Sequence, residues 1–387
     1  MFQPKRAEHR LLLACAKTQG YQTKVNDTFE DASLDWMYVY ALADHHRITP
    51  LLYFFLRSNP QIEVPEQAAA KIKAHAGNLG VANLFQTKEL TGLLADISGA
   101  GLEAMPFKGP ALGQYLYENV GLRPFGDLDI LIHRKDFTPI KALLLQRGYK
   151  PYREFSAEEE ARFLATQMGF EFVSKDERSV VEVHWSFLNA VHSFRLSEAV
   201  VWKERVQLDL AGDTVEVFSP AHLLVYLCAH GSKSLWARLR WVCDVAELVA
   251  KHQDEAFWTQ VLQIAHASRG TRMLLTGLRL AHALLAAPLP DHIRRLVLKD
   301  EQVATLSADV VASYFAHSPD GMHTINPVTF HLNMQERFID RLPYYKHLFQ
   351  LWTSPSTKDK AFVALPRYLE FLYVLIKPIR MIVHRNR

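Results

Sequence analysis

The chain has 387 residues, of which 49% are hydrophobic and 22% are charged, and this composition is typical of a globular protein with a buried core and excludes a disordered chain. The formal net charge is only +3, so no strong overall field draws the protein to nucleic acid. Three scattered cysteines exclude a disulfide framework or a zinc cluster, and no apolar run approaches the roughly 20 residues of a membrane-spanning helix.

Residues 1–83 are predicted to form a helical N-terminal region without visible chemistry. Residues 9–17 and 29–45 have amphipathic helical patterns, and Pro50 opens the apolar run LLYFFL, as proline often does at a helix start. The polar stretch that follows the first apolar run has no convincing export cleavage site. We therefore expect a cytoplasmic protein.

Residues 84–215 are predicted to form a small mixed α/β core. Its expected elements, in chain order, are a helix that ends at Gly99, a strand at 104–107, a helix at 111–117, a strand at 127–132, a helix at 136–147, and a hairpin of strands at 169–174 and 179–185. The turn Lys108-Gly109-Pro110 suits the junction between the first strand and its helix.

Two helical parts are expected after the core. Ser219 and Pro220 make a good cap and first turn for the helical patterns that follow, and we predict a helical domain at 216–290 that packs on the core. A helical region at 291–387 ends in a tail, residues 366–387, that combines apolar and basic residues. This tail predicts a contact with a membrane surface or a partner, or packing on its own protein. The fold class is α+β, with a mixed-sheet core between helical regions.

The stretch GDLDILI contains two aspartates, Asp127 and Asp129, two positions apart in a predicted strand. The alternation of side chains along a strand points both carboxylates to one face. Two acids side by side repel each other and are costly to bury unless a cation or a proton is shared between them. Oxygen ligands of this kind suit Mg²⁺ or Mn²⁺. We favour such a metal site over a structural pair that caps a loop and binds Arg123 or Arg134.

A third carboxylate, Glu182, lies in the valine-rich strand predicted at 179–185, and His184 shares its face. If this strand lies beside the strand of the aspartates, the three acids converge and can hold two cations that stabilise the attacking and leaving oxygens of an in-line phosphoryl or nucleotidyl transfer. Two alternatives remain open. Glu182 can instead form an ion pair at a sheet edge, and His184 can be hydrogen-bonded structure rather than a contact for water or substrate.

Together these residues resemble the uncharacterised nucleotidyltransferase group of the DNA-polymerase-β-like superfamily. The resemblance covers about residues 80–260 and rests on the runs FKGPALGQYLY, RPFGDLDILI, VEVHW and HGSKSLWARLRWVCDVAEL. In that superfamily a glycine turn between a strand and a helix precedes an Asp-x-Asp strand, and a third acid follows on a later strand. The turn usually reads Gly-Ser, whereas this chain has Lys108-Gly109-Pro110, so Lys108 would supply charge in place of the serine.

The resemblance implies Asp127, Asp129 and Glu182 as catalytic residues and as ligands of Mg²⁺ or Mn²⁺, with Glu182 either a third ligand or a general base. Backbone N–H groups from Gly109 onwards would face the phosphates at a helix N-terminus, and Arg123 would hold a phosphate oxygen bidentately. The full set of predicted nucleotide-binding residues is Lys108, Gly109, Arg123, Gly126, His184 and Lys233.

Lys233 and Arg240 are seven residues apart and share a helix face, if Gly231 does not end the helix first. They could then reach a triphosphate or an acceptor. For Arg240 we slightly favour an ion pair with Asp244 at i,i+4 instead. His230 is left undecided.

The predicted function is the transfer of a nucleoside monophosphate from an NTP, such as ATP, to the hydroxyl of an acceptor, with release of pyrophosphate. Catalysis would come from positioning and charge neutralisation. The alternative is a non-catalytic nucleotide-binding protein with a regulatory or scaffolding role, although three intact acids count against it. The near-neutral charge favours a small molecule or a protein over nucleic acid as acceptor.

Overall fold

The structure is a computed structural model that describes residues 4–17, 34–315 and 325–353, together with residues 359, 362–366, 369, 372–377 and 380. The described residues fall into two compact units, one within 1–189 and 194–334 and the other within 190–193 and 335–387. The predicted boundaries after residues 83, 215 and 290 all lie inside the first unit. The division after residue 334 was not predicted.

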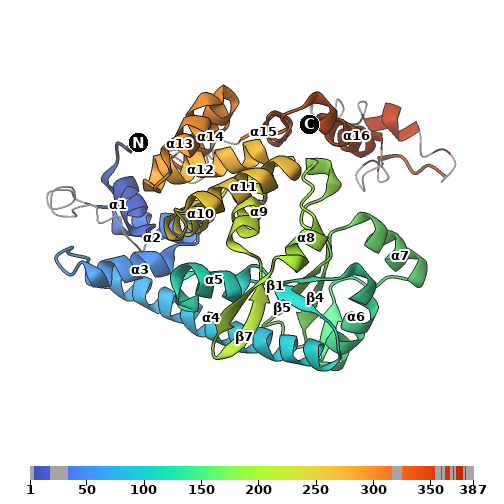
Figure 1. Cartoon of the computed structure of the whole chain (residues 1–387), viewed down its shortest axis with the longest axis horizontal. Helices are drawn as coiled ribbons and strands as arrows, with labels where there is room; N and C mark the ends of the chain where they lie inside the picture. The colour runs from blue at the N-terminus through green and yellow to red at the C-terminus, as the bar shows by residue number, and fades with distance from the viewer. Residues whose placement is uncertain are drawn as a thin grey trace. The chain divides into compact units, whose positions relative to one another are not determined.

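A five-stranded mixed sheet forms the β part of the first unit (Figure 1). Its strands are β1 (Ala104–Pro106), β2 (Leu128–Ile132), β3 (Tyr149–Pro151), β4 (Gly169–Ser174) and β5 (Val180–His184), in the order β1-β2-β5-β4-β3. Strands β2 and β5 run parallel, whereas the other neighbours run antiparallel. Strand β5 is therefore central and β2 is paired on both sides, so neither strand lies at an edge.

The two faces of β2 pack against different parts of the chain. Leu128, Ile130 and Ile132 are completely buried in a core shared with β5 and with the helices α4 (Glu66–Gly99) and α6 (Phe137–Gln146). Leu131 belongs to a second core that contains most of the buried residues of the helical regions. Because side chains alternate along a strand, Asp129 lies on the same face as Leu131 and points towards the helical side.

The remaining helices precede, connect or follow these strands along the chain. They are α1 (Ala7–Cys15), α2 (Trp36–His45), α3 (Thr49–Ser58), α5 (Gly109–Tyr117), α7 (Ala157–Thr166), α8 (Glu198–Lys203), α9 (Pro220–Lys233), α10 (Leu239–Lys251), α11 (Glu255–Ala267), α12 (Thr271–Leu285), α13 (Asp291–Lys299), α14 (Glu301–Tyr314) and α15 (Pro327–Met334), and a separate hairpin pairs β6 (Val206–Leu210) with β7 (Asp213–Val217). The predicted α+β class with a mixed-sheet core is confirmed.

Helix α4 is one continuous helix of 34 residues. It passes alongside α5 and α6 (Figure 1), and the predicted boundary between residues 83 and 84 lies inside it. Its last third buries Leu90, Leu93 and Ile97 against the sheet, as the helical pattern predicted. Of the expected helix at 29–45, residues 29–33 lie outside the described residues.

Helix α9 begins at Pro220, as predicted, and runs through Gly231 to Lys233. Ser219 stands at its N-cap, but its hydroxyl lies 2.8 Å from Nδ1 of His222 and caps no backbone N–H. Gly231 does not end the helix. Its missing side chain makes room for the ring of Trp236, which is completely buried.

We expect Gly231→Ala to lower the free energy of unfolding by about 1–3 kcal/mol, as overpacking of a core does. A Cβ atom at this position would lie 2.6 Å from ring atoms of Trp236. Gly77→Ala in α4 is the matched control, because a Cβ there meets nothing within 4 Å and alanine is favoured over glycine inside a helix by about 1 kcal/mol. Urea unfolding followed by circular dichroism measures both. Two variants of equal stability would contradict the packing argument.

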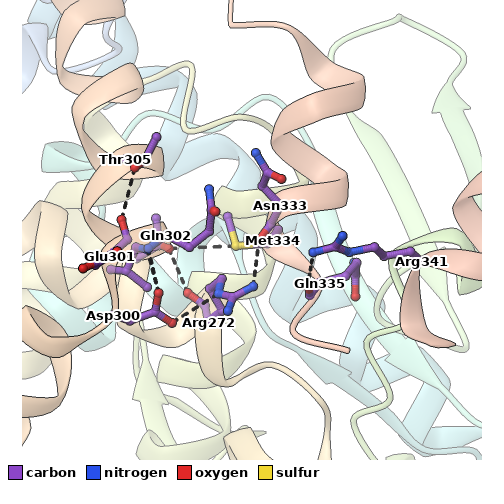
Figure 2. Close-up of polar contacts among 11 residues, drawn as sticks. Arg272, Asp300, Glu301, Gln302, Thr305, Asn333, Met334, Gln335 and Arg341 are labelled. Carbon is purple, nitrogen blue, oxygen red and sulfur yellow. Dashed lines mark hydrogen bonds and ion pairs between the residues drawn. The ribbon is translucent and has the colours of Figure 1, made fainter. Parts of the chain in front are cut away.

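Arg272 of α12 ties the last helices of the first unit together (Figure 2). Its Nε donates to Oδ2 of Asp300 at 3.2 Å, and its Nη1 donates to the carbonyl of Asn333 at 2.9 Å. Asp300 also accepts hydrogen bonds from the backbone N–H groups of Gln302 and Val303 and so caps α14. These contacts join α12, α14 and the end of α15.

The second unit contains α16 (Phe338–Thr353) and the short segment 190–193. The hydroxyl of Ser193 donates to the carbonyl of Asp340 at 2.6 Å, and the side-chain amide of Gln335 donates to the carbonyl of His192 at 2.7 Å. Much of the predicted basic tail, residues 366–387, lies outside the described residues. Among the helices that the structure describes, none has the length and apolar character needed to cross a bilayer.

Candidate metal centre

Asp129 and Glu182 lie directly opposite each other on the parallel strands β2 and β5. Opposite residues of paired strands point to the same face, so the fold brings the two carboxylates together, as the sequence predicted. Because β5 is the central strand, Glu182 is not at a sheet edge, and the alternative of an edge ion pair does not apply. Glu171 of β4 is opposite Glu182 on its other side; the sequence analysis did not single it out.

The closest cluster of ligand atoms consists of Asp129, Glu182 and His184, whose atoms lie within 4.8 Å of one another. Nε2 of His184 lies 3.0 Å from Oδ1 of Asp129 and 3.2 Å from Oε2 of Glu182. The predicted triad had Asp127 in place of His184. Asp127 is half-buried in the bend just before β2 and lies outside this cluster.

Lys108 brings a positive charge into the same cluster. Its Nζ donates to Oδ1 of Asp129 at 2.6 Å, and its side chain is 14% exposed. The sequence places it there because Gly109, the first residue of α5, adopts a positive φ of 53° and approaches the carbonyl oxygen of Asp127, where a Cβ would lie at 3.1 Å. A residue with a side chain would be strained at Gly109.

The charges of this cluster stabilise one another. Burial opposes ionisation of Asp129, but Lys108 and His184 hold the pKa of this carboxyl well below its usual range. Burial likewise lowers the pKa of His184, and its hydrogen bonds to Asp129 and Glu182 outweigh this and raise the pKa overall. The pKa of Asp127 is raised, chiefly by burial and then by Asp129. The acids therefore differ: Asp129 is firmly ionised, whereas Asp127 takes up a proton more readily.

Helix α9 faces the cluster with Tyr226, His230 and Lys233. Burial, reinforced by Lys108, lowers the pKa of Lys233, while Glu182 and Asp129 act in the opposite direction. The pKa of His230 is lowered well below its usual value, by burial first and then by the neighbouring lysines. Tyr226 was not among the residues predicted from the sequence. Its signal was the spacing of the three residues by four and three positions, which places them on one helical face.

The ring of Phe107 packs between the cluster of Asp129, Glu182 and His184 and helix α9. Its ring meets the rings of His184 and Tyr226 edge-on, with centroids 5.1 and 5.3 Å apart, and stacks on Phe218. The Nζ of Lys108 lies 5.3 Å from the centre of the Phe107 ring. A cation at this distance from an aromatic face is attracted to it, so the ring helps to hold the ammonium group beside Asp129.

Arg123 has a different partner from the one predicted. Its Nε and Nη2 each donate at 2.9 Å to the two carboxylate oxygens of Asp244 on α10, and the hydroxyl of Tyr117 donates to the same carboxylate at 3.2 Å. Both members of the ion pair are buried. The guanidinium edge expected to hold a phosphate is thus occupied by a carboxylate of the protein. We assign Arg123 a structural role.

Arg240 does not form the expected i,i+4 ion pair, because Asp244 is bound by Arg123. The guanidinium of Arg240 donates instead to the carbonyl of Pro124, in the loop that leads to the aspartates. Burial lowers its pKa to about 10. Gly126, in the same loop, is exposed, and a Cβ there would meet nothing within 4 Å, so packing gives no reason for a glycine at this position.

The donor atoms fit a divalent cation. Asp129 is only 2% exposed, and its Oδ2 has no hydrogen-bond partner among the residues that the structure describes. A buried carboxylate oxygen without a partner is costly, and a cation bound there would satisfy it. Asp127 and Glu182 are the neighbouring acids, and their carboxylate oxygens are further donors. Oxygen donors of this kind suit Mg²⁺ or Mn²⁺.

A family model described as uncharacterised nucleotidyltransferase matches residues 32–286 of the chain. Among solved structures, the chain is similar to an antigenic nucleotidyltransferase-like protein from Paracoccidioides brasiliensis, with 14% sequence identity and a TM-score of 0.30, over 54% of this chain and 96% of that one. A TM-score of this size does not establish a common fold. No curated protein matches the chain.

Proposed function

The chain belongs to the family of uncharacterised nucleotidyltransferases, and we propose that it is a metal-dependent enzyme that transfers a nucleoside monophosphate from an NTP to the hydroxyl group of an acceptor. The match confirms the family predicted from the sequence. ATP is one of the nucleotides we expect it to use, and Mg²⁺ or Mn²⁺ is the metal we expect it to bind.

The observation that carries this proposal concerns the carboxylate of Asp129. Asp129 and Glu182 lie opposite each other on β2 and β5. Oδ2 of Asp129 is buried and has no hydrogen-bond partner among the described residues. A site for structure alone would leave no such oxygen, because the same carboxylate could be replaced by an apolar residue at less cost. Asp127, Asp129 and Glu182 are the residues that would hold the metal.

In the proposed reaction, the acceptor oxygen forms a bond to the α-phosphorus of the NTP while the bond from that phosphorus to the oxygen bridging to the β-phosphate breaks. Pyrophosphate leaves with the electron pair of that bond, and the acceptor's hydroxyl proton passes to a carboxylate. A bound divalent cation supplies charge neutralisation for the transferring phosphoryl group. Among the acids, Asp127 is the first candidate for the proton, because burial raises its pKa. Lys108 and His184 hold Asp129 ionised. For Glu182, the second candidate, burial acts to raise the pKa, but His184, through its hydrogen bond and its charge, outweighs it and lowers the pKa.

The chain's basic residues would bind and orient the triphosphate. Lys233 lies at the end of α9 on the face that is turned to the acids, and Lys108 stands at the start of α5. Positioning of this kind is the main source of rate enhancement in phosphoryl transfer. The predicted contacts of Gly109 and Gly126 with the nucleotide remain part of the proposal. The predicted contact of His184 does not, because its Nε2 is turned to Asp129 and Glu182.

The test offers each α-³²P-labelled NTP, with Mg²⁺ or Mn²⁺, to the protein together with a cell extract. We expect a labelled acceptor, or labelling of the protein itself, that disappears in the double variant Asp127→Ala with Asp129→Ala. Normal labelling by this variant would overturn the assignment of the site. Binding of NTP without any transfer would instead favour the alternative, a regulatory or scaffolding protein that binds nucleotides.

The acceptor is proposed to be a small molecule or a protein, and the protein is proposed to act in the cytoplasm. A contact of residues 366–387 with a membrane or a partner stays a prediction.

A further inference from the structure

The ammonium group of Lys108 occupies a position beside Asp129 that a metal ion could otherwise take. Its Nζ lies 2.6 Å from Oδ1, a short contact of the kind formed between charged groups. The side chain is only 14% exposed, it starts from the N-cap of α5, and its Nζ lies 5.3 Å from the centre of the Phe107 ring. This lysine is thus a fixed cation of the site.

The two carboxylate oxygens of Asp129 differ in their hydrogen bonds. Oδ1 receives Lys108 at 2.6 Å and Nε2 of His184 at 3.0 Å, and two donors fill the two lone pairs of a carboxylate oxygen. Oδ2 has no partner among the described residues. In a site with two metal ions about 3.5–4 Å apart, a shared aspartate would offer one oxygen to each ion. In this site, Oδ2 is the one oxygen of Asp129 that has no hydrogen-bond partner among the described residues.

His184 does not supply the missing ligand. Its Nε2 contacts two carboxylates, and that geometry requires Nε2 to carry a proton and to donate. A histidine that binds a metal almost always donates from its other ring nitrogen to a polar group, whereas Nδ1 of His184 is buried without a partner among the described residues. Nδ1 packs over Gly169, where a Cβ would lie 2.9 Å from it. His184 therefore acts as a donor that orients the acids.

We propose that this site binds one divalent cation, on Oδ2 of Asp129 together with Asp127 or Glu182, and that the ammonium group of Lys108 takes the place of a second one. The inference rests on the proposed function and departs from the two-cation arrangement that the sequence analysis considered. The bound ion would contact Oδ2 of Asp129, and Lys108 would stay on Oδ1. A neutral residue at position 108 would remove one of the two donors on Oδ1, leave only His184 there, and make room for a second ion.

The test counts Mn²⁺ ions on the intact chain by electron paramagnetic resonance, in the presence of α,β-methylene analogues of the four nucleoside triphosphates, which cannot be cleaved at the α-phosphorus. For the wild type we expect one bound Mn²⁺ per chain and the spectrum of an isolated ion. For Lys108→Met we expect two ions per chain and the spectrum of a spin-coupled pair, because ions about 4 Å apart interact strongly.

Two variants serve as controls. Lys108→Arg keeps the charge and should remain at one ion. Lys251→Met removes a lysine that pairs with Glu118 at the end of α5 and should behave as the wild type. Circular dichroism checks that each variant is folded. The number of Mn²⁺ ions bound by the wild-type chain tests the inference even if a variant fails to fold.

The outcomes are distinct. A spin-coupled pair in the wild type would overturn this inference and leave the proposed function intact. A folded Lys108→Met protein that still binds one ion would overturn the role of Lys108. Wild-type protein that binds no Mn²⁺ at all would overturn both the inference and the metal dependence on which it rests.

Discussion

Asp129→Asn is expected to lower the rate of nucleotidyl transfer by about a thousandfold or more while the protein remains folded. A metal that polarises a phosphoryl group contributes several kcal/mol to the stabilisation of the transition state, and each 1.4 kcal/mol or so changes the rate about tenfold. Asp129 is the most deeply buried of the three acids and the one whose open oxygen the proposed metal requires.

The amide of asparagine fails in either orientation. With its nitrogen at the Oδ1 position, it would present N–H groups to Lys108 and His184, which are themselves donors at that point. With its nitrogen at the Oδ2 position, it would place donors where the cation binds. Both orientations also leave the buried ammonium of Lys108 without its counter-charge, so some stability is lost with the activity.

Steady-state transfer of the labelled nucleotide measures the effect, and thermal unfolding separates activity from stability. Asp176→Asn, in the exposed turn between β4 and β5, is the matched control and should leave the rate unchanged. A double variant, Asp129→Asn with Lys108→Met, removes both buried charges; we expect it to regain stability but no transfer. An Asp129→Asn protein with more than a tenth of wild-type activity would contradict the assigned role.

Asp244→Asn is expected to lower the free energy of unfolding by about 3–5 kcal/mol, the usual cost of removing one partner of a buried ion pair. The guanidinium of Arg123 makes two hydrogen bonds to Asp244, and the side chains are only 4% and 0% exposed. Without the carboxylate, a positive charge remains buried. With its oxygen in the Oδ1 position, the asparagine amide still accepts from Tyr117 and from Nε of Arg123, but its NH₂ group then faces Nη2 of Arg123, which is also a donor.

Urea unfolding followed by circular dichroism measures this loss. Replacing both partners, Arg123→Met with Asp244→Leu, should recover most of the stability, because an apolar pair of similar volume replaces a buried ion pair at little cost. Lys251→Met, which breaks an exposed pair with Glu118, should show no comparable loss. Wild-type stability of Asp244→Asn would show that Arg123 is not held as described.

Much of the fold could be predicted from local patterns. Strands β1, β2, β4 and β5 and helices α5 and α6 lie where hydrophobic periodicity and glycine placed them. The missed strands were the three-residue β3, which is too short for a pattern, and the hairpin of β6 with β7. The sequences VQLDL and DTVEV do alternate apolar and polar residues on either side of a glycine turn, so this hairpin had a signal that was overlooked. The full length of α4 was missed because Gly77 and Gly80 weaken a helical pattern locally, whereas tertiary packing of its buried face holds the helix together.

The site could be predicted only in part. The spacing of Asp127 and Asp129 and the valine pattern around Glu182 indicated the acids, because an acid in an apolar strand needs a partner. The partners themselves are far apart in the sequence. Lys108 reaches Asp129 across 21 positions and Arg123 reaches Asp244 across 121, and no local pattern encodes such pairs. Asp127 lies outside the observed cluster of ligand atoms for a different reason: β2 begins at Leu128, so Asp127 stands in the bend before the strand and the alternation of strand side chains does not apply to it.

Helix α5 connects the acids to the helical part of the first unit. At its start Lys108 contacts Asp129, and at its far end Tyr117 and Glu118 contact Asp244 and Lys251 of α10. The sheet is consequently not a self-sufficient module that evolution could exchange on its own. A lineage that lost or replaced α10 would leave the buried guanidinium of Arg123 without its counter-charge and the hydroxyl of Tyr117 without its acceptor, so we expect these residues and the helix to change together.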